Sequence, residues 1–263
     1  MTHLVLVLIL LLLGCGKTDT PQAQAPPPAQ TAVSSTQETD SPAMFVATLT
    51  SYDIGIMRKG PKWSSDAPAK MKEISKKNGE PWRQAVKEGS LVGLAQIVDP
   101  KEIVAIFFFK NKTAESMKAM AKNAPIVKAG LVTAEVQKVW GTKGLGVDIA
   151  EKMGADPKMT PTKETYYLVY TTKGKNWSAK SDAPETREVT SEQIQYMYEL
   201  HKAGQMKYFC AFEDMNMDIR GFGFFKANSD KEALELMTKS PSVKKGWLTA
   251  DVKTVEVAAG VLK

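Results

Sequence analysis

The sequence predicts an α+β protein that contains two copies of one small four-stranded unit. The first observation behind this prediction is an internal repeat. Gly60–Pro68 recurs as Gly174–Pro184, and Ala124–Val136 recurs as Ser240–Val252, at offsets between 114 and 116 residues. Two matched blocks at a nearly constant offset indicate a duplicated domain.

The second observation is that both copies predict the same order of elements, β-α-β-β-α-β. This order is that of a ferredoxin-like unit, a four-stranded antiparallel sheet with both helices on one face. The first copy predicts strands over 45–57, 91–98, 103–109 and 131–140. Its helices are predicted over 69–88, broken near Asn78-Gly79 and restarted by Pro81, and from a Thr113 cap to 122. The second predicts strands over 165–172, 206–213, 218–226 and 248–257, with helices over 191–203 and from a Ser229 or Asp230 cap.

The third observation is the run Ile103–Phe109, which has no polar residue. A strand with one face in water alternates polar and apolar residues, so a continuous apolar run indicates burial on both faces. The second copy is always present to cover the outer face. We therefore expect the two sheets to pack face to face as a barrel-like intramolecular pseudo-dimer, in a monomeric protein. In the second copy, the strand that corresponds to Ile103–Phe109 is Ile219–Phe225. Its Gly221 and Gly223 predict close approach of another backbone or of a ligand.

The N-terminus indicates export rather than fold. Leu4–Leu13 is an apolar run too short to cross a bilayer as a helix but suited to a signal peptide. Leu12–Cys15 matches the lipobox of bacterial lipoproteins, although no Lys or Arg precedes the apolar run. A lipid such as palmitate on Cys15 would anchor the protein to the membrane. Gly16 resembles the residue found there in outer-membrane lipoproteins, which would face the periplasm of a double-membraned bacterium.

Composition divides the chain into an anchor, a tether and two domains. A Pro-, Gln-, Ser- and Thr-rich segment after the cysteine has almost nothing to bury and indicates a disordered tether. The predicted parts are a signal peptide 1–14, a tether 15–42, a first domain 43–140, a linker 141–163 and a second domain 164–263.

Charge and cysteine content exclude some classes of function. The net charge is +6, but no cluster of basic and aromatic residues indicates a nucleic-acid partner. Cys210 lies in an apolar strand and is expected to be a buried, inert thiol. His201 lies near a helix end and is expected to have a surface or capping role. The sequence has no cluster of Cys and His residues of the kind that binds a metal ion, so neither a metal nor another cofactor is predicted.

The repeated motifs resemble the YCII-related family. Arg58–Trp63 and Pro125–Val136 carry the resemblance in the first copy. The resemblance implies a dimeric α/β-barrel fold. Better-understood members of the family are similar to small enzymes that act on ring-derived acids, with a His on the first helix and an Asp before the Pro of the second motif. Ala124 and Ser240 stand where the Asp would be, and no His stands at the position on the first helix where the family has one, about eight to eleven residues before Gly89 or Gly204. The family's acid–base pair is therefore missing from both copies, and its chemistry is not carried over.

Equivalent residues around the turn after each first strand are the candidates for ligand binding. Aromatic rings there could line a cleft or plug the end of the barrel, and cations could hold an anionic ligand. The acidic residues before Ala-Pro could serve a turn instead. The candidates are Arg58, Trp63, Asp66, Lys173, Trp177 and Asp182.

These observations favour a lipid-anchored, non-catalytic module that binds a small anionic ligand or an envelope partner. The alternative is a YCII-like enzyme, of isomerase or lyase type on a small organic acid, with a non-standard site. A structural scaffold is the third hypothesis. A closed polar pocket holding an acid or base of perturbed pKa would favour the enzyme, and a filled barrel would favour the scaffold.

Overall fold

A computed structural model describes residues 41–78, 84–86, 88–110, 113–147, 149, 162–178 and 183–262. The chain divides into two units, Met1–Thr48 and Leu49–Lys263. The predicted signal peptide, Cys15, the tether up to residue 40 and Asp182 lie outside the described residues. Within the described part, every helix is too short or too polar to cross a bilayer.

The first described element is helix α2 (Pro42–Ala47), which corrects the prediction of a strand from Phe45. The Ser41 hydroxyl caps this helix by accepting a hydrogen bond from the Met44 N–H at 3.3 Å. Pro42 occupies the first turn, where its missing N–H costs nothing. These local signals outweigh the β-propensity of the apolar residues that follow them.

The second unit contains the eight strands of the fold, close to their predicted positions. Two single-turn helices, α6 (Pro125–Lys128) and α10 (Pro241–Lys244), are additional to the prediction. The long helix α8 (Pro184–Lys202) begins seven residues before the expected 191, because Pro184 starts it. The first half contains β1 (Thr50–Lys59), α3 (Ala67–Asn78), β2 (Leu91–Ile97), β3 (Ile103–Phe109), α5 (Ala114–Asn123), α6 (Pro125–Lys128) and β4 (Val132–Gly141). The second contains β5 (Lys163–Lys173), α8 (Pro184–Lys202), β6 (Met206–Phe212), β7 (Ile219–Phe225), α9 (Asp230–Thr238), α10 (Pro241–Lys244) and β8 (Leu248–Ala258).

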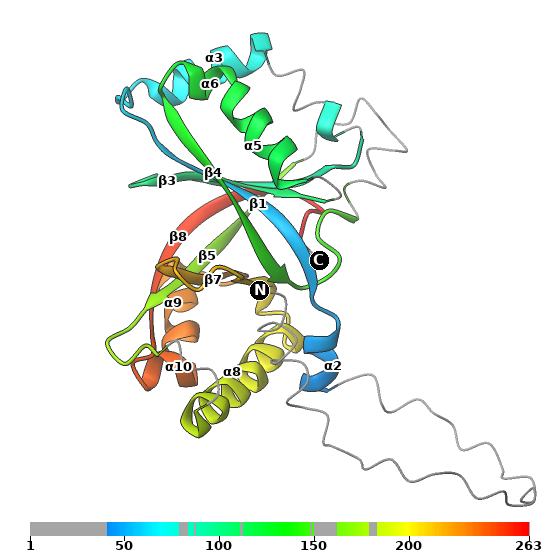
Figure 1. Ribbon diagram of the computed structural model, residues 1–263, viewed down its shortest axis with the longest axis vertical. Coiled ribbons are helices and arrows are strands. Elements are labelled where there is room, and N and C mark those ends of the chain that lie inside the picture. The colour runs from blue at the N-terminus through cyan, green and yellow to red at the C-terminus, as the bar shows by residue number, and fades with distance from the viewer. Residues whose placement is uncertain are drawn as a thin grey trace, which may run out of the picture. The chain divides into compact units, whose positions relative to one another are not determined.

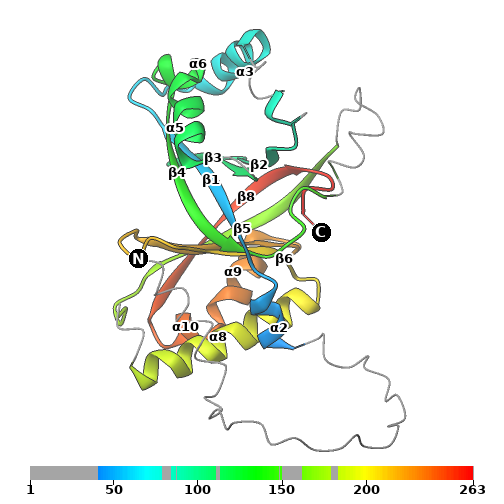
Figure 2. The ribbon, with the colours of Figure 1, turned by 45° about the vertical axis from the view of Figure 1, so that its right-hand side comes forward.

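The strands form one closed antiparallel barrel in the order β1-β3-β2-β8-β5-β7-β6-β4. Helices α3, α5 and α6 lie on one side of it and α8, α9 and α10 on the other (Figures 1 and 2). The expected barrel-like arrangement of the two four-stranded sheets is thus present as one closed barrel, which pairing between the sheet edges completes. The edges of the two four-stranded sets join by hydrogen bonds, because closure satisfies edge groups that separate sheets would leave unpaired.

The two seams that close the barrel use matching registers. At one seam β2 pairs with β8 through Ala95–Ile97, with Ile97 opposite Val255. At the other, β6 pairs with β4 through Cys210–Phe212, with Phe212 opposite Val139. Each seam has only three residue pairs, so most of β4 and most of β8 pair on one side alone.

The barrel interior is filled with aromatic rings. The Phe108 ring lies with its centroid 5.6 Å from that of Tyr208, 6.1 Å from Phe222 and 5.8 Å from Phe224. Phe107, on the other face of β3, packs against the apolar layer beneath the helices. Strand β3 is thus covered on both faces, which is the physical reason for its uninterrupted apolar sequence.

The glycines of β7 give room to neighbouring protein atoms. A Cβ added at Gly221 would lie 2.5 Å from the Cys210 carbonyl oxygen, and one at Gly223 would lie 2.9 Å from the Phe225 ring. Of the two predicted explanations, close approach of backbone therefore applies at Gly221. At Gly223 a neighbouring side chain fills the space.

The described part of the predicted linker belongs to the core. Leu145 and Ile149 are buried in the barrel cluster. The Gly146 N–H donates to the Val261 carbonyl at 2.8 Å, which ties this segment to the C-terminus. Residues 141–147 and 149 therefore pack at the barrel instead of only spacing the two halves.

Candidate functional site

The turns that carry Trp63 and Trp177 are built alike. The Gly60 N–H donates to the Leu131 carbonyl at 2.9 Å, and the Gly174 N–H donates to the Trp247 carbonyl at 2.8 Å. Trp63 is half-buried against the apolar layer under the first-half helices. The ring therefore packs beneath the helices, which is neither of the two positions that the sequence analysis offered, a ligand cleft or the end of the barrel.

The Arg58 guanidinium is held by two carboxylates. Its Nη1 lies 2.7 Å from Glu102 Oε1, and its Nε and Nη2 lie 3.2 and 3.0 Å from Glu135 Oε1. Glu102 immediately precedes β3 and Glu135 lies in β4, the two strands that pair with β1, so the ion pairs form when the sheet forms. The charge that was expected to hold an anionic ligand is thus compensated within the protein.

Asp66 serves the turn before α3. It accepts a hydrogen bond from the Ser64 hydroxyl, and its Oδ2 lies 2.8 Å from Lys70 Nζ. The Lys70 hydrogen bond lowers the pKa of this exposed carboxyl, with a smaller effect from Ser64. Asp66 therefore has the local role that sequence reasoning offered as the alternative to ligand binding.

In the second half, Trp177 lies against a residue that the sequence analysis did not select. The Arg220 guanidinium carbon is 5.1 Å from the Trp177 ring centroid. Arg220 is buried and donates to the carbonyls of Asp214 at 2.7 Å and Met217 at 3.3 Å. Burial lowers its pKa. Lys173 Nζ donates to the Asn216 carbonyl at 3.1 Å, so both cations organise the loop before β7.

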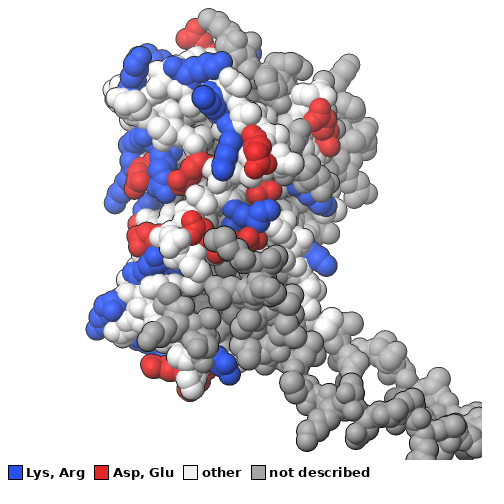
Figure 3. All heavy atoms as spheres, viewed as in Figure 1, with Lys and Arg blue, Asp and Glu red and all other residues white. Residues whose placement is uncertain are grey.

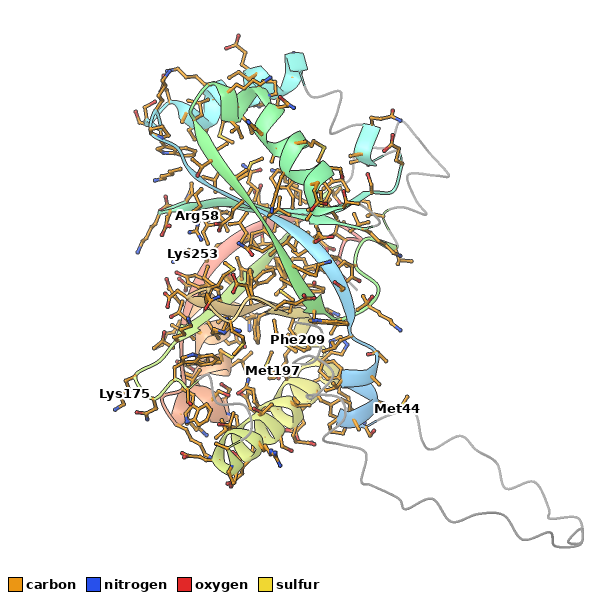
Figure 4. All side chains as sticks on the ribbon, viewed as in Figure 1. Met44, Arg58, Lys175, Met197, Phe209 and Lys253 are labelled. Carbon is orange, nitrogen blue, oxygen red and sulfur yellow. The ribbon has the colours of Figure 1, made fainter. Side chains whose placement is uncertain are left out.

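A charged network lies at the end of the barrel near Arg58. The Tyr170 hydroxyl donates to Asp251, and Lys253 Nζ lies 2.8 Å from the same carboxylate. Burial and the Asp251 hydrogen bond raise the Tyr170 pKa, with a smaller contribution from the Glu102 charge. Figure 4 labels Arg58 and Lys253 at this end. The Tyr170 hydroxyl, the Asp251 carboxylate and the Lys253 ammonium therefore each have a partner within this network.

An open groove of about 550 Å³ runs along β4. Its most informative feature is that five consecutive residues of one strand contribute to it. Because successive side chains point to opposite faces of a sheet, a groove lined by both sets wraps the edge of the strand. The lining residues are Lys118, Lys122, Val127, Thr133, Ala134, Glu135, Val136 and Gln137.

The groove combines an apolar floor with a basic rim. Val127, Ala134 and Val136 supply apolar surface. Neither Lys118 nor Lys122 of α5 forms an ion pair within the described residues, whereas the Glu135 carboxylate is engaged by Arg58. Figure 3 shows this face, with Lys and Arg side chains over its upper part and Asp and Glu among them. The rim thus favours an anionic occupant.

A second polar cluster lies at the β4–β6 seam. Asp53 Oδ1 is 3.8 Å from Lys138 Nζ, and the Glu213 N–H donates to the Lys138 carbonyl at 3.1 Å. Burial raises the pKa of Glu213, Lys138 opposes the rise and Asp53 adds to it. Within the described part, Asp53 Oδ1 and Trp140 Nε1 are buried without a hydrogen-bond partner.

Replacing Glu213 by glutamine is expected to stabilise the protein at pH 7 by roughly a few tenths of a kcal/mol, because solvent screens this half-buried group. The raised pKa means that the folded protein favours the protonated carboxyl, so ionised Glu213 opposes folding at pH 7. The difference should vanish below pH 4.5, the ordinary value. Denaturant titrations at pH 7 and pH 4 measure this, with exposed Glu188→Gln as the control. An equal effect of Glu213→Gln at both pH values would contradict the assignment.

The predicted buried thiol is confirmed. Cys210 is free and buried, and burial raises its pKa. His201 lies in the last turn of α8, with Nδ1 3.0 Å from the Met206 carbonyl, in agreement with the expected helix-end role.

The described part of the chain forms an α+β fold around one closed antiparallel barrel. No protein-family model and no curated protein sequence matches the chain. It is similar to a protein from Lactobacillus acidophilus classed by inference as a monooxygenase, at 14% identity and a TM-score of 0.44, over 81% of this chain and 99% of that one. It is also similar to a mutant chlorite dismutase from Candidatus Nitrospira defluvii, at 10% identity and a TM-score of 0.47, over 84% of this chain and 96% of that one. At these identities and TM-scores the likeness supports no conclusion about this chain.

Sequence reasoning missed Lys118, Lys122 and Arg220. The two lysines are four residues apart on α5 and so share one helix face, but the sequence does not tell which strand edge that face borders. Arg220 had a visible signal, because it is the charged residue of an otherwise apolar strand.

Proposed function

We propose that the protein is a lipid-anchored envelope protein whose two YCII-like halves form an intramolecular pseudo-dimer that binds an anionic ligand or the anionic part of an envelope partner. The observation that carries the binding role is the β4 groove, where Lys118 and Lys122 border an apolar floor. This site replaces the proposed one around Arg58, whose charge is already compensated.

The lipobox at Cys15 and the tether support the anchoring. The matching registers of the two seams support the pseudo-dimer. On this proposal the folded part faces the periplasm from the outer membrane if the cell has two membranes, and its cargo is bound rather than converted.

The test is anion binding by the full chain. Citrate is expected to raise the melting temperature at low ionic strength, and added salt should weaken this effect because exposed charges are screened. The double variant Lys118→Glu/Lys122→Glu should lose most of the shift. Lys72→Glu/Lys76→Glu on α3 changes the net charge equally on another exposed helix and should keep it. Equal loss in both variants would refute the groove as the site.

One observation favours the enzyme alternative, namely the seam cluster of Asp53, Lys138 and Glu213. A carboxyl group with a raised pKa beside a second carboxylate is suited to proton transfer on a small organic acid. Solvent deuterium exchange into a panel of small organic acids, followed by NMR, separates the two functions. Exchange that depends on Asp53 and Glu213 would favour the enzyme, and binding of the acids without exchange would favour the module.

A further inference from the structure

We infer that the free edge of β4 binds an extended acidic peptide segment of a partner protein by strand addition, which rests on the proposed function and specifies its ligand. Residues Val132–Gln137 pair with β1 on one side. On the other side, the described strands pair only with the far end of β4, at Val139–Gly141. The groove lies along this open stretch and includes both faces of the strand.

The direction of the backbone groups follows from one hydrogen bond. The Lys138 carbonyl accepts from the Glu213 N–H on the β6 side at 3.1 Å. Because the N–H and C=O of a strand residue point to the same side and the side alternates along the strand, those of Ala134 and Val136 point to the open edge. They form the ladder that an added strand would use.

The repeat supplies an internal comparison. Val252 of β8 corresponds to Val136, and its strand is likewise open beyond the β2 seam. There, however, the edge is capped by side chains. The Val252 N–H donates to Asp251 Oδ1 at 2.8 Å, and Lys253 Nζ donates to the Val252 carbonyl at 3.1 Å. Such capping is a common protection of edge strands against added strands.

The β4 edge lacks this protection in the described part of the chain. Glu135, which corresponds to Asp251, turns to Arg58 instead. Gln137 stands in place of Lys253, and no described side chain hydrogen-bonds the Val136 backbone. One edge of the duplicated pair is therefore closed, and the other is open beside a groove.

The basic rim of the β4 groove favours a partner segment with negative charge. Lys118 and Lys122 border the β4 edge, whereas Leu234 and Thr238 occupy the corresponding positions of α9. A second copy of this chain would pair β4 with β4 about a two-fold axis and place both lysine pairs on the same face, where like charges repel. In an added strand alternate side chains share one face, so acidic residues at every second position of the peptide would point together toward Lys118 and Lys122.

The test uses a capped hexapeptide of alternating glutamate and valine, with a fluorescent label, and the full chain. The peptide is expected to bind, and Val136→Pro should weaken binding roughly tenfold or more because it removes an edge N–H and places a ring on the edge. Val252→Pro is the matched control on the other half and should bind as the wild type does. In amide exchange, bound peptide should protect the Val136 N–H. Thermal melts of both variants verify folding.

The outcomes separate the two proposals. Loss of binding in Val136→Pro, and for a peptide N-methylated at every residue, supports strand addition. Binding of the N-methylated peptide and by Val136→Pro, with loss only in Lys118→Glu/Lys122→Glu, overturns strand addition but keeps the anion site. Failure of both the peptide and citrate to bind the wild type overturns both proposals.

Discussion

Replacing Phe108 by alanine is expected to lower the free energy of unfolding by about 3–5 kcal/mol. The side chain is fully buried, and its ring contacts three rings that come from β6 and β7 of the other half. The change therefore removes apolar burial and leaves a cavity that rigid aromatic neighbours fill poorly. Chemical denaturation of the full chain, followed by tryptophan fluorescence, measures the loss.

The same variant tests whether the halves unfold together. Because the two halves share one barrel core, a single transition is expected to shift as a whole. Leu94→Ala is the control, since Leu94 lies on β2 with 39% of its surface exposed and should cost roughly 0.5 kcal/mol or less. A Phe108→Ala protein in which only one of two transitions moved would contradict the shared core.

Replacing Gly141 by alanine is expected to destabilise the protein by about 1–3 kcal/mol through overpacking at the β4–β6 seam. A Cβ at this position would lie 2.2 Å from the Tyr208 hydroxyl oxygen and 2.7 Å from the ring carbon that carries it. Tyr208 is buried among other rings and has little room to move. The measurement is again the free energy of unfolding.

Tyr208→Phe supplies the second arm of this test. The Tyr208 hydroxyl is buried without a hydrogen-bond partner in the described structure, so its removal alone should be neutral or stabilising. In the double variant, Tyr208→Phe should recover part of the loss caused by Gly141→Ala, because the nearest clashing atom is gone. Strictly additive effects would show that the Tyr208 hydroxyl is not what excludes a side chain at Gly141.

The elements that could be predicted from sequence are those with local causes. Thr113 caps α5 by accepting the Ser116 N–H at 3.2 Å, and Ser229 caps α9 by accepting the Glu232 N–H at 3.1 Å, as the residue types indicate. The mistaken strand at Phe45 came from giving apolar composition more weight than the Ser41–Pro42 start signal. The late start predicted for α8 came from overlooking Pro184 in the same way.

The candidate site depended on contacts that no local pattern contains. Arg58 was a reasonable anion ligand as an isolated cation, but the fold brings Glu102 and Glu135 to it. Conversely, Lys118 and Lys122 had no distinguishing neighbours in the sequence. They matter only because α5 packs beside the part of β4 that the second seam leaves open.

The sequence by itself determined the internal repeat of motifs, the order of elements around each set of motifs and the need to cover both faces of Ile103–Phe109. Periodicity and repeats report which surfaces each segment must bury, and these are properties of the chain. The tertiary structure alone decided that the sheets close by edge pairing and that the two halves treat their free edges differently. The physical reason is that strand partners and ion pairs depend on register between distant segments, so Asp251 caps a strand edge while Glu135 reaches an arginine.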